Sequence, residues 1–196
     1  MIRLHGGREA PTLPSVQTFA PGLLVATPQL TDSNFRRSVI LMLEHSEGGS
    51  MGIIINRGAS LTLGELAKNQ SLEIAPERVN QPVFMGGPVE NHRGFVLHNV
   101  ESVQEKHEVV PGLFLSLTLD SLGPLLKDPS AHLRFCLGYA GWGAQQLESE
   151  MSSGSWLYAE ASARPVLEGD PGMLWENSLK SMGVDPAMLL KGKGLN

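Results

Sequence analysis

The sequence predicts an α+β fold: one compact domain with a mixed, mostly antiparallel sheet and several flanking helices. Apolar segments of strand length follow one another in runs, with few regular strand–helix–strand alternations, which disfavours a doubly wound sheet. The chain has 22 Gly and 13 Pro among 196 residues, as expected for many turns and short elements. This length suits one domain. We expect the domain to span residues 16–190, with a flexible leader at 1–15 and a frayed tail at 191–196.

The expected strands are short and apolar, and most end at Gly, Pro or a polar cluster. They cover residues 22–26, 38–44, 52–56, 82–85, 94–98, 113–118, 133–137 and 156–161. Residues 38–44 are almost continuously apolar, which predicts a central strand covered on both faces. Residues 52–56 are expected to return beside it as an antiparallel hairpin.

Four helices are expected between these strands, at residues 62–68, 120–127, 144–153 and 171–182. Thr62 and Glu65 have capping-box spacing, and Asp120 is the expected cap of the second helix. Gly154 and Gly183 are natural stops for the last two helices.

Three glycines around a tryptophan, Gly138, Gly141 and Gly143 with Trp142, mark the end of the 133–137 strand. A strand that breaks on glycines before a helix can cradle an anion. However, a P-loop requires Lys and Ser/Thr where this chain has Ala144 and Gln145, and the glycine spacing reverses the dinucleotide fingerprint. We therefore favour a strand-to-helix joint with Trp142 packed in the core, at which a β-branched residue in place of Gly141 would damage folding.

Composition disfavours several classes of protein. The net charge is −5 and the one adjacent basic pair is Arg36-Arg37, which argues against non-specific nucleic-acid binding. The single cysteine, Cys136, excludes an intramolecular disulfide and disfavours a cysteine zinc site. No apolar run approaches the ~18 residues that span a bilayer, and the first residues lack the apolar core of a secretory signal. We expect a cytoplasmic protein without a metal or cofactor.

Polar residues stand at the ends of the central strands, namely Glu44 and His45 on one and Asn56 and Arg57 on its partner. They can simply be solvated or cap turns, or they can form a polar cluster at the rim of the sheet with His45 as acid or base. His98 follows an apolar run and is expected to be a satisfied, half-buried histidine. The sequence contains no motif for hydrolytic, redox or phosphoryl-transfer chemistry, so we lean against an enzyme.

A candidate pocket combines the glycine-rich turns with these polar residues. It comprises Arg37, Glu44, His45, Asn56, Arg57, Gly86, Gly87, Pro88, His98, Gly138, Gly141 and Trp142.

Several blocks in register together resemble one known family. The blocks are residues 22–28 with Phe35, 37–39 leading to Glu44-His45, 52–57, 86–89, 94–98, 138–142, 146–148 and 156–157. In this order they resemble the AlgH/YqgE family of small bacterial proteins, over roughly residues 19–182. The resemblance implies a compact α+β fold of unusual sheet topology in the bacterial cytosol.

The resemblance also implies a regulatory role, but no specific biochemical activity. The family is largely uncharacterised biochemically, is associated by name with alginate regulation, and is sometimes labelled as transcriptional regulators. This chain lacks an evident helix-turn-helix and a basic recognition helix, so direct DNA binding is not expected. We expect indirect regulation through an unidentified protein partner. The alternative is a small-molecule or anion-binding protein, or an unrecognised enzyme, with its pocket at the glycine-rich turns. The oligomeric state stays open.

Overall fold

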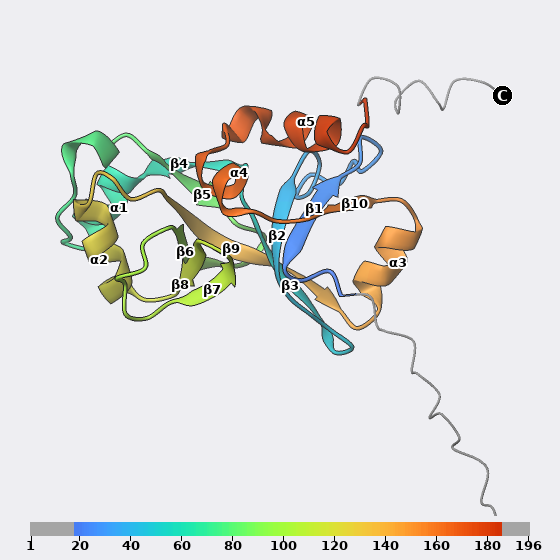
Figure 1. Ribbon diagram of the computed structural model, residues 1–196, viewed down its shortest axis with the longest axis horizontal. Coiled ribbons are helices and arrows are strands. Elements are labelled where there is room, and N and C mark those ends of the chain that lie inside the picture. Colours follow the sequence, from blue (N-terminus) through green and yellow to red (C-terminus); the bar gives the residue numbers. More distant parts are fainter. Residues whose placement is uncertain (1–17, 186–196) are drawn as a thin grey trace, which may run out of the picture.

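One long strand, β9 (Leu133–Gly143), crosses the molecule and belongs to both halves of a single curled sheet (Figure 1). The computed structural model describes residues 18–185, apart from the side chain of Leu119. The first half of β9 pairs antiparallel with β6 (Val89–His98) and parallel with β5 (Pro82–Met85). Its last residues pair antiparallel with β3 (Gly49–Ile54). The described residues therefore form one sheet-rich domain.

The strands are ordered β10-β1-β2-β3-β9-β6-β8-β7, and β4 and β5 form a side branch on β9. The remaining bounds are β1 (Gly22–Ala26), β2 (Val39–Ser46), β4 (Gly58–Thr62), β7 (His107–Val110), β8 (Leu113–Ser116) and β10 (Trp156–Ala159). The pairing of β5 with β9 is parallel and the other pairings are antiparallel, which confirms a mostly antiparallel sheet.

The predicted central strand is β2, and it is covered on both faces. Val39 and Leu41 join the core cluster that lies beneath α4 (Ala163–Glu168) and α5 (Pro171–Ser181). Ile40 and Met42 point to the opposite face, into the cluster that includes α3 (Gln146–Ser152). Successive strand side chains alternate between faces, so an unbroken apolar run is stable only where both faces are buried.

A third core cluster fills the other half of the molecule, under α1 (Leu63–Asn69) and α2 (Leu119–Lys127). A short 3₁₀ turn (Pro76–Arg78) lies between α1 and β5. The predicted capping box at Thr62 and Glu65 is present. The predicted cap Asp120 is wrong: Thr118 has the extended backbone of a cap and its hydroxyl accepts a hydrogen bond from the Ser121 amide, while Asp120 lies in the first helical turn.

The glycine-rich corner is not a strand-to-helix joint. Strand β9 continues through it to Gly143, and α3 starts three residues later. Gly141 is exposed, and a Cβ there would meet Tyr139 at an ordinary 3.5 Å. Gly138 is the constrained position, because its φ is +75° and a Cβ would lie 2.6 Å from the Gly87 carbonyl oxygen. A larger residue is therefore expected to damage folding at Gly138 rather than at Gly141, so the prediction for Gly141 is wrong. Trp142 is packed in the core, as predicted.

Besides the 3₁₀ turn, three elements have no counterpart in the sequence prediction: β4, β7 and α4. Their residues are mostly exposed or half-buried, so they lack the apolar pattern that marks the other elements. Gly154 and Gly183 end their helices as predicted, with φ of +76° and +72°. The predicted leader at 1–15 and tail at 191–196 lie outside the described residues. Among the described residues, no helix is long and apolar enough to cross a bilayer.

Candidate functional site

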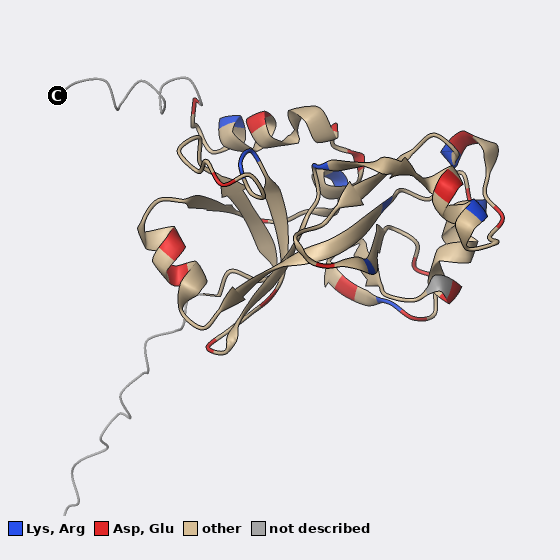
Figure 2. Ribbon diagram, turned by 180° about the vertical axis from the view of Figure 1, so that it is seen from behind, with Lys and Arg blue, Asp and Glu red and all other residues tan. Residues whose placement is uncertain are grey.

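A cavity lies between the loop that follows β1 and helix α5. It has a volume of about 580 Å³ and continues into a second hollow of about 370 Å³. The two share four lining residues, Arg36, Arg37, Trp175 and Glu176. We call this continuous depression the arginine groove. Figure 2 shows basic positions on the loop directly beside basic and acidic positions of α5.

The loop is shaped by a local polar turn and one aromatic anchor. The carbonyl of Asp32 accepts hydrogen bonds from the amides of Phe35 and Arg36, and its carboxylate accepts from the amide of Asn34. These are the interactions expected of a polar turn cluster. Phe35 packs between Trp142 and Trp156, with ring centroids 6.3 and 5.8 Å away. Consequently Arg36 and Arg37, which follow the anchor, remain exposed.

Asn56 and Arg57, two predicted pocket residues, hold this loop in place. The Arg57 guanidinium donates to the carbonyl oxygens of Asn34 at 2.5 Å and Arg36 at 3.1 Å, as well as to that of Ser33. Asn56 donates to the Arg37 carbonyl at 2.9 Å, and its side-chain oxygen accepts from the Val39 amide at 2.8 Å. Burial, then the nearby charge of Arg36, lowers the pKa of Arg57. Both residues border the second hollow, so they support the loop and line the groove.

Arg37 spans the groove to α5. Its guanidinium lies 4.9 Å from the ring centre of Trp175, and its Nη2 is 3.8 Å from Glu176 Oε1. Trp175 is itself fixed, because it is 4% exposed and its indole N–H donates to the Ala26 carbonyl at 2.7 Å. The backbone φ of Arg37 is +56°, an unfavourable value for a residue with a Cβ. The bonds from Asn56 and Arg57 maintain this conformation.

Basic groups gather around the groove although the whole chain is acidic. Arg36, Arg37, Arg57 and Lys180 line it, against the carboxylates of Glu176 and Asp185. Within residues 18–185, the side chains of Arg36 and Lys180 have no hydrogen bond or ion pair. The candidate pocket predicted from the sequence included neither Arg36, which was noted only as half of a basic pair, nor Trp175 and Lys180. The signal for this site was the basic pair directly after a polar turn.

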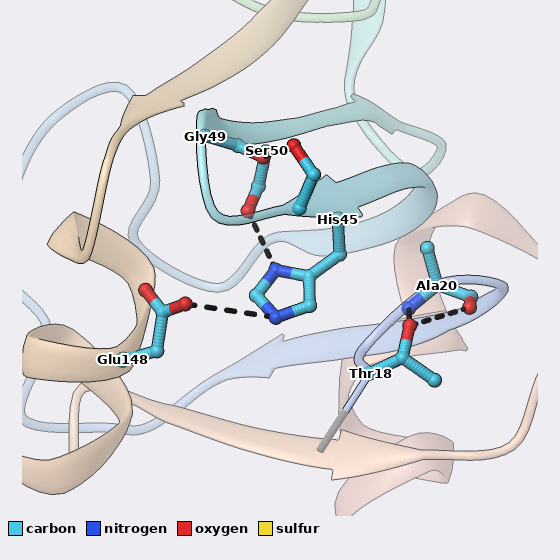
Figure 3. Close-up of polar contacts among 7 residues, drawn as sticks. Thr18, Ala20, His45, Gly49, Ser50 and Glu148 are labelled. Atoms are coloured by element: carbon cyan, nitrogen blue, oxygen red, sulfur yellow. Dashed lines mark hydrogen bonds and ion pairs between the residues drawn. The ribbon is translucent and has the colours of Figure 1, made fainter. Parts of the chain in front are cut away.

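His45 lies away from the groove, beneath α3 (Figure 3). Its Nδ1 is 2.8 Å from Ser50 Oγ on the neighbouring strand, and its Nε2 is 3.6 Å from Glu148 Oε1 on α3. The ring of Phe19 covers it at 4.9 Å. These are the residue types of a nucleophilic triad, but the His45 side chain is 1% exposed and Ser50 is 9% exposed. The cluster therefore joins α3 to the hairpin and offers a substrate little access to the hydroxyl.

Glu44 and His45 are adjacent on β2 and point to opposite faces. Glu44 lines a separate hollow with Met51 and Arg93, on the face away from α3. The structure thus gathers Arg37, Asn56 and Arg57 at the groove and places Glu44 and His45 elsewhere.

His98 is fully buried and has partners for both ring nitrogens. The Val100 amide donates to Nδ1 at 3.2 Å, so the ring proton is on Nε2, which donates to Ser116 Oγ at 3.0 Å. The Ser116 hydroxyl in turn donates to the Glu105 carbonyl at 2.7 Å. Burial, with a smaller contribution from the charge of Lys106, lowers the pKa of His98 to about 4. This is the satisfied histidine that the sequence predicted, although more deeply buried.

The glycine turns pack against each other. A Cβ on Gly86 would collide with the Gly138 carbonyl, and one on Gly87 with the backbone of Tyr139. Pro88, Gly138, Gly141 and Trp142 belong to this region or to β9, and they are not among the lining residues of the groove. Backbone therefore occupies the space between these turns, which leaves little room for the anion that the alternative interpretation would place there.

The described residues show neither a candidate metal site nor a reactive thiol. Residues 18–185 contain no group of three His, Cys, Asp or Glu side chains placed to hold a metal ion. Cys136 is fully buried, and burial raises the pKa of its thiol to about 12, so it is not a reactive thiolate.

Comparison with known proteins gives a consistent picture over almost the whole chain. A family model described as AlgH-like matches residues 23–187. A UPF0301 protein of Myxococcus xanthus is 63% identical over 181 residues, covering 92% of this chain and 100% of that protein. A UPF0301 protein of Bordetella petrii is 38% identical over 179 residues, covering 90% of this chain and 89% of that protein.

Two solved structures share the fold. The solution structure of the AlgH protein from Pseudomonas aeruginosa aligns with a TM-score of 0.68 and 30% identity, covering 97% of this chain and 100% of that one. A crystal structure of a protein from Corynebacterium diphtheriae aligns with a TM-score of 0.67, covering 86% of this chain and 90% of that one. At 21% identity, the second comparison concerns the fold alone.

Proposed function

The chain belongs to the AlgH-like family, and we propose that it binds a small anionic molecule in the arginine groove. The observation that carries this proposal is that Arg36 on the loop and Lys180 on α5 line one cavity of about 580 Å³, and that neither side chain has a hydrogen bond or ion pair with another residue of the described range 18–185. Ligand pockets for small molecules have volumes of ~300–1,000 Å³. The chain as a whole carries a charge of −5, so this local excess of basic groups is not a property of the surface at large.

The groove is preorganised for such a ligand. Arg57 and Asn56 hold the loop backbone through side-chain hydrogen bonds, so binding does not have to order this segment. Arg36 and Arg37 present planar guanidinium groups, which suit the two oxygens of a carboxylate or phosphate. Glu176 and Asp185 on the α5 side would favour a ligand that also carries a donor or a positive group.

The test is a titration of the full chain with inorganic phosphate and with citrate, followed by amide chemical shifts in NMR spectra. We expect the shifts to concentrate in residues 27–37 and in α5. Arg36→Gln should weaken binding by at least about tenfold, since a charge-assisted hydrogen bond contributes roughly 1.5–3 kcal/mol. Arg164→Gln is the matched control, because Arg164 is exposed on α4 and outside the groove. Equal affinity of Arg36→Gln and the unaltered chain would refute the assignment.

A second candidate is regulation of another cytosolic protein by direct contact. It is supported by the exposed apolar Met173, which is 43% exposed on α5, the helix whose other residues line the groove. A partner bound there would contact the same helix as the ligand. Capture of a partner by the unaltered chain but not by Met173→Asp would support this role, whereas equal capture by both would count against it. The acidic balance of the chain gives direct DNA binding no support.

A further inference from the structure

Two arginines are almost completely buried at a second cavity, separate from the arginine groove. Arg78 is 2% exposed and Arg134 is 3% exposed, and both line a space of about 290 Å³ beside the first turn of α5. Pro171 borders both this cavity and the groove. A guanidinium keeps its charge in proteins, so each side chain brings a buried positive charge to this place.

Arg78 is bonded to neutral acceptors. Its Nε and Nη2 donate to the Asp128 carbonyl at 3.0 and 2.6 Å, and Nη2 also donates to the Ala131 carbonyl. Its Nη1 donates to the side-chain oxygen of Gln81 at 3.1 Å. Backbone carbonyls and an amide satisfy donors, but they do not neutralise the charge.

Arg134 is less well satisfied. Its Nη1 donates to the Ile55 carbonyl and its Nη2 to the Gly169 carbonyl. Its guanidinium carbon lies 4.9 Å from the centre of the Phe84 ring. The Nε of Arg134 is buried and has no acceptor among residues 18–185. Native proteins seldom leave a buried donor of a charged group without a partner.

Neither guanidinium has a carboxylate within ion-pair distance among the described residues. Asp128 and Asp170 act on Arg78 and Arg134 only through longer-range attraction. The Asp170 carboxylate accepts from the Gly172 amide at 2.8 Å, and Glu168 is paired with Arg164 at 3.5 Å. Burial lowers the pKa of both arginines, as expected for charges that lack a close counter-ion.

We propose that this cavity binds a small oxyanion, a phosphate or a carboxylate, between Arg78 and Arg134. The anion would accept from the Arg134 Nε and supply the negative charge that two buried guanidinium groups otherwise lack. A volume of about 290 Å³ suits an ion of a few atoms or the terminal group of a small metabolite. This site is distinct from the arginine groove and does not depend on the function proposed for it.

The test uses the full chain and two readouts at constant ionic strength. The first is the Nε–H resonance of Arg134 during titration with inorganic phosphate or acetate, with chloride as the reference salt. The second is the urea midpoint, because an anion that binds only the folded state raises the free energy of unfolding by RT ln(1 + [L]/Kd). We expect the resonance to shift saturably and the midpoint to rise in phosphate.

The variants separate this site from the groove. In Arg36→Gln both effects should persist, whereas Arg134→Met should abolish the rise in midpoint, and Arg78→Lys should weaken phosphate binding about tenfold. Response to phosphate alone identifies a tetrahedral oxyanion, and response to acetate as well identifies a site for carboxylates. An unchanged Arg134 resonance in both anions overturns the proposal, and so does a stabilisation that Arg36→Gln removes. The resonance is measured on the unaltered chain, so a variant that does not fold leaves the proposal testable.

Discussion

The buried imidazole of His98 predicts that the fold loses stability in mild acid. In the folded chain the pKa of His98 is about 4, because burial removes the water that would solvate an imidazolium. In the unfolded chain it is expected near its ordinary value of about 6.5. Between these values the unfolded chain binds one more proton than the folded chain, so the free energy of unfolding falls as the pH falls.

The size of the effect follows from the gap between the two pKa values. One pKa unit corresponds to about 1.4 kcal/mol, so the gap allows a loss of about 3 kcal/mol. The loss should begin as the pH drops below about 6.5, reach about 2 kcal/mol at pH ~5, and level off below pH ~4. Many domains have a total stability of only ~5–15 kcal/mol, so this loss is measurable.

The assay is urea unfolding at pH ~7 and pH ~5, for the unaltered chain and for His98→Gln. The glutamine should lower stability at neutral pH by roughly 1–3 kcal/mol, because the bonds with Ser116 and Val100 are disturbed. It should also remove about 2 kcal/mol of the acid-dependent loss. His92→Gln, at an exposed position, supplies the reference curve. If His98→Gln and the unaltered chain lose the same stability between the two pH values, the reasoning fails.

Two further predictions concern the glycine-rich strand and the tryptophans beside it. Gly138→Ala should lower the free energy of unfolding, measured in urea, by about 2 kcal/mol or more, because φ at Gly138 is left-handed and the Gly87 carbonyl is close. Gly141→Ala should change it by no more than about 0.5 kcal/mol. Equal losses of stability in the two variants would contradict this prediction. Glu150 accepts hydrogen bonds from the indoles of Trp142 and Trp156 at 2.9 and 2.8 Å. Glu150→Ala should therefore cost roughly 2 kcal/mol and alter tryptophan fluorescence, and an unchanged midpoint and spectrum would show that water replaces the carboxylate.

The strands with strong apolar patterns could be predicted because apolar residues occupy the positions whose side chains are buried. Residues 39–42 in β2 are apolar without a break, and each face of that strand meets its own core cluster. The capping box at Thr62 could be predicted equally well, since it depends on two side chains that are three residues apart in the sequence. By contrast, β4 and β7 have few buried side chains, and they are strands because their neighbours offer backbone partners. Such pairing is decided by residues distant in sequence.

The candidate site was only partly predictable for a related reason. Asn56 and Arg57 follow β3, and their positions at a strand end marked them as polar residues leaving the core. What they contact, the loop carbonyls between Ser33 and Arg37, lies about twenty residues earlier in the chain. In the same way, Glu150 accepts hydrogen bonds from the indoles of Trp142 and Trp156, because α3 packs beside both tryptophans.

The sequence by itself determined the family, the mostly antiparallel sheet and the burial of its central strand, because these properties follow from local patterns of apolar residues, glycines and caps. The tertiary structure decided which side chains meet. It packed backbone into the space between Gly87 and Gly138 and buried the His45 side chain beside α3. It also placed Arg36 and Lys180 at the same cavity. Contacts of this kind depend on how distant segments pack, and packing is a property of the whole chain rather than of any segment.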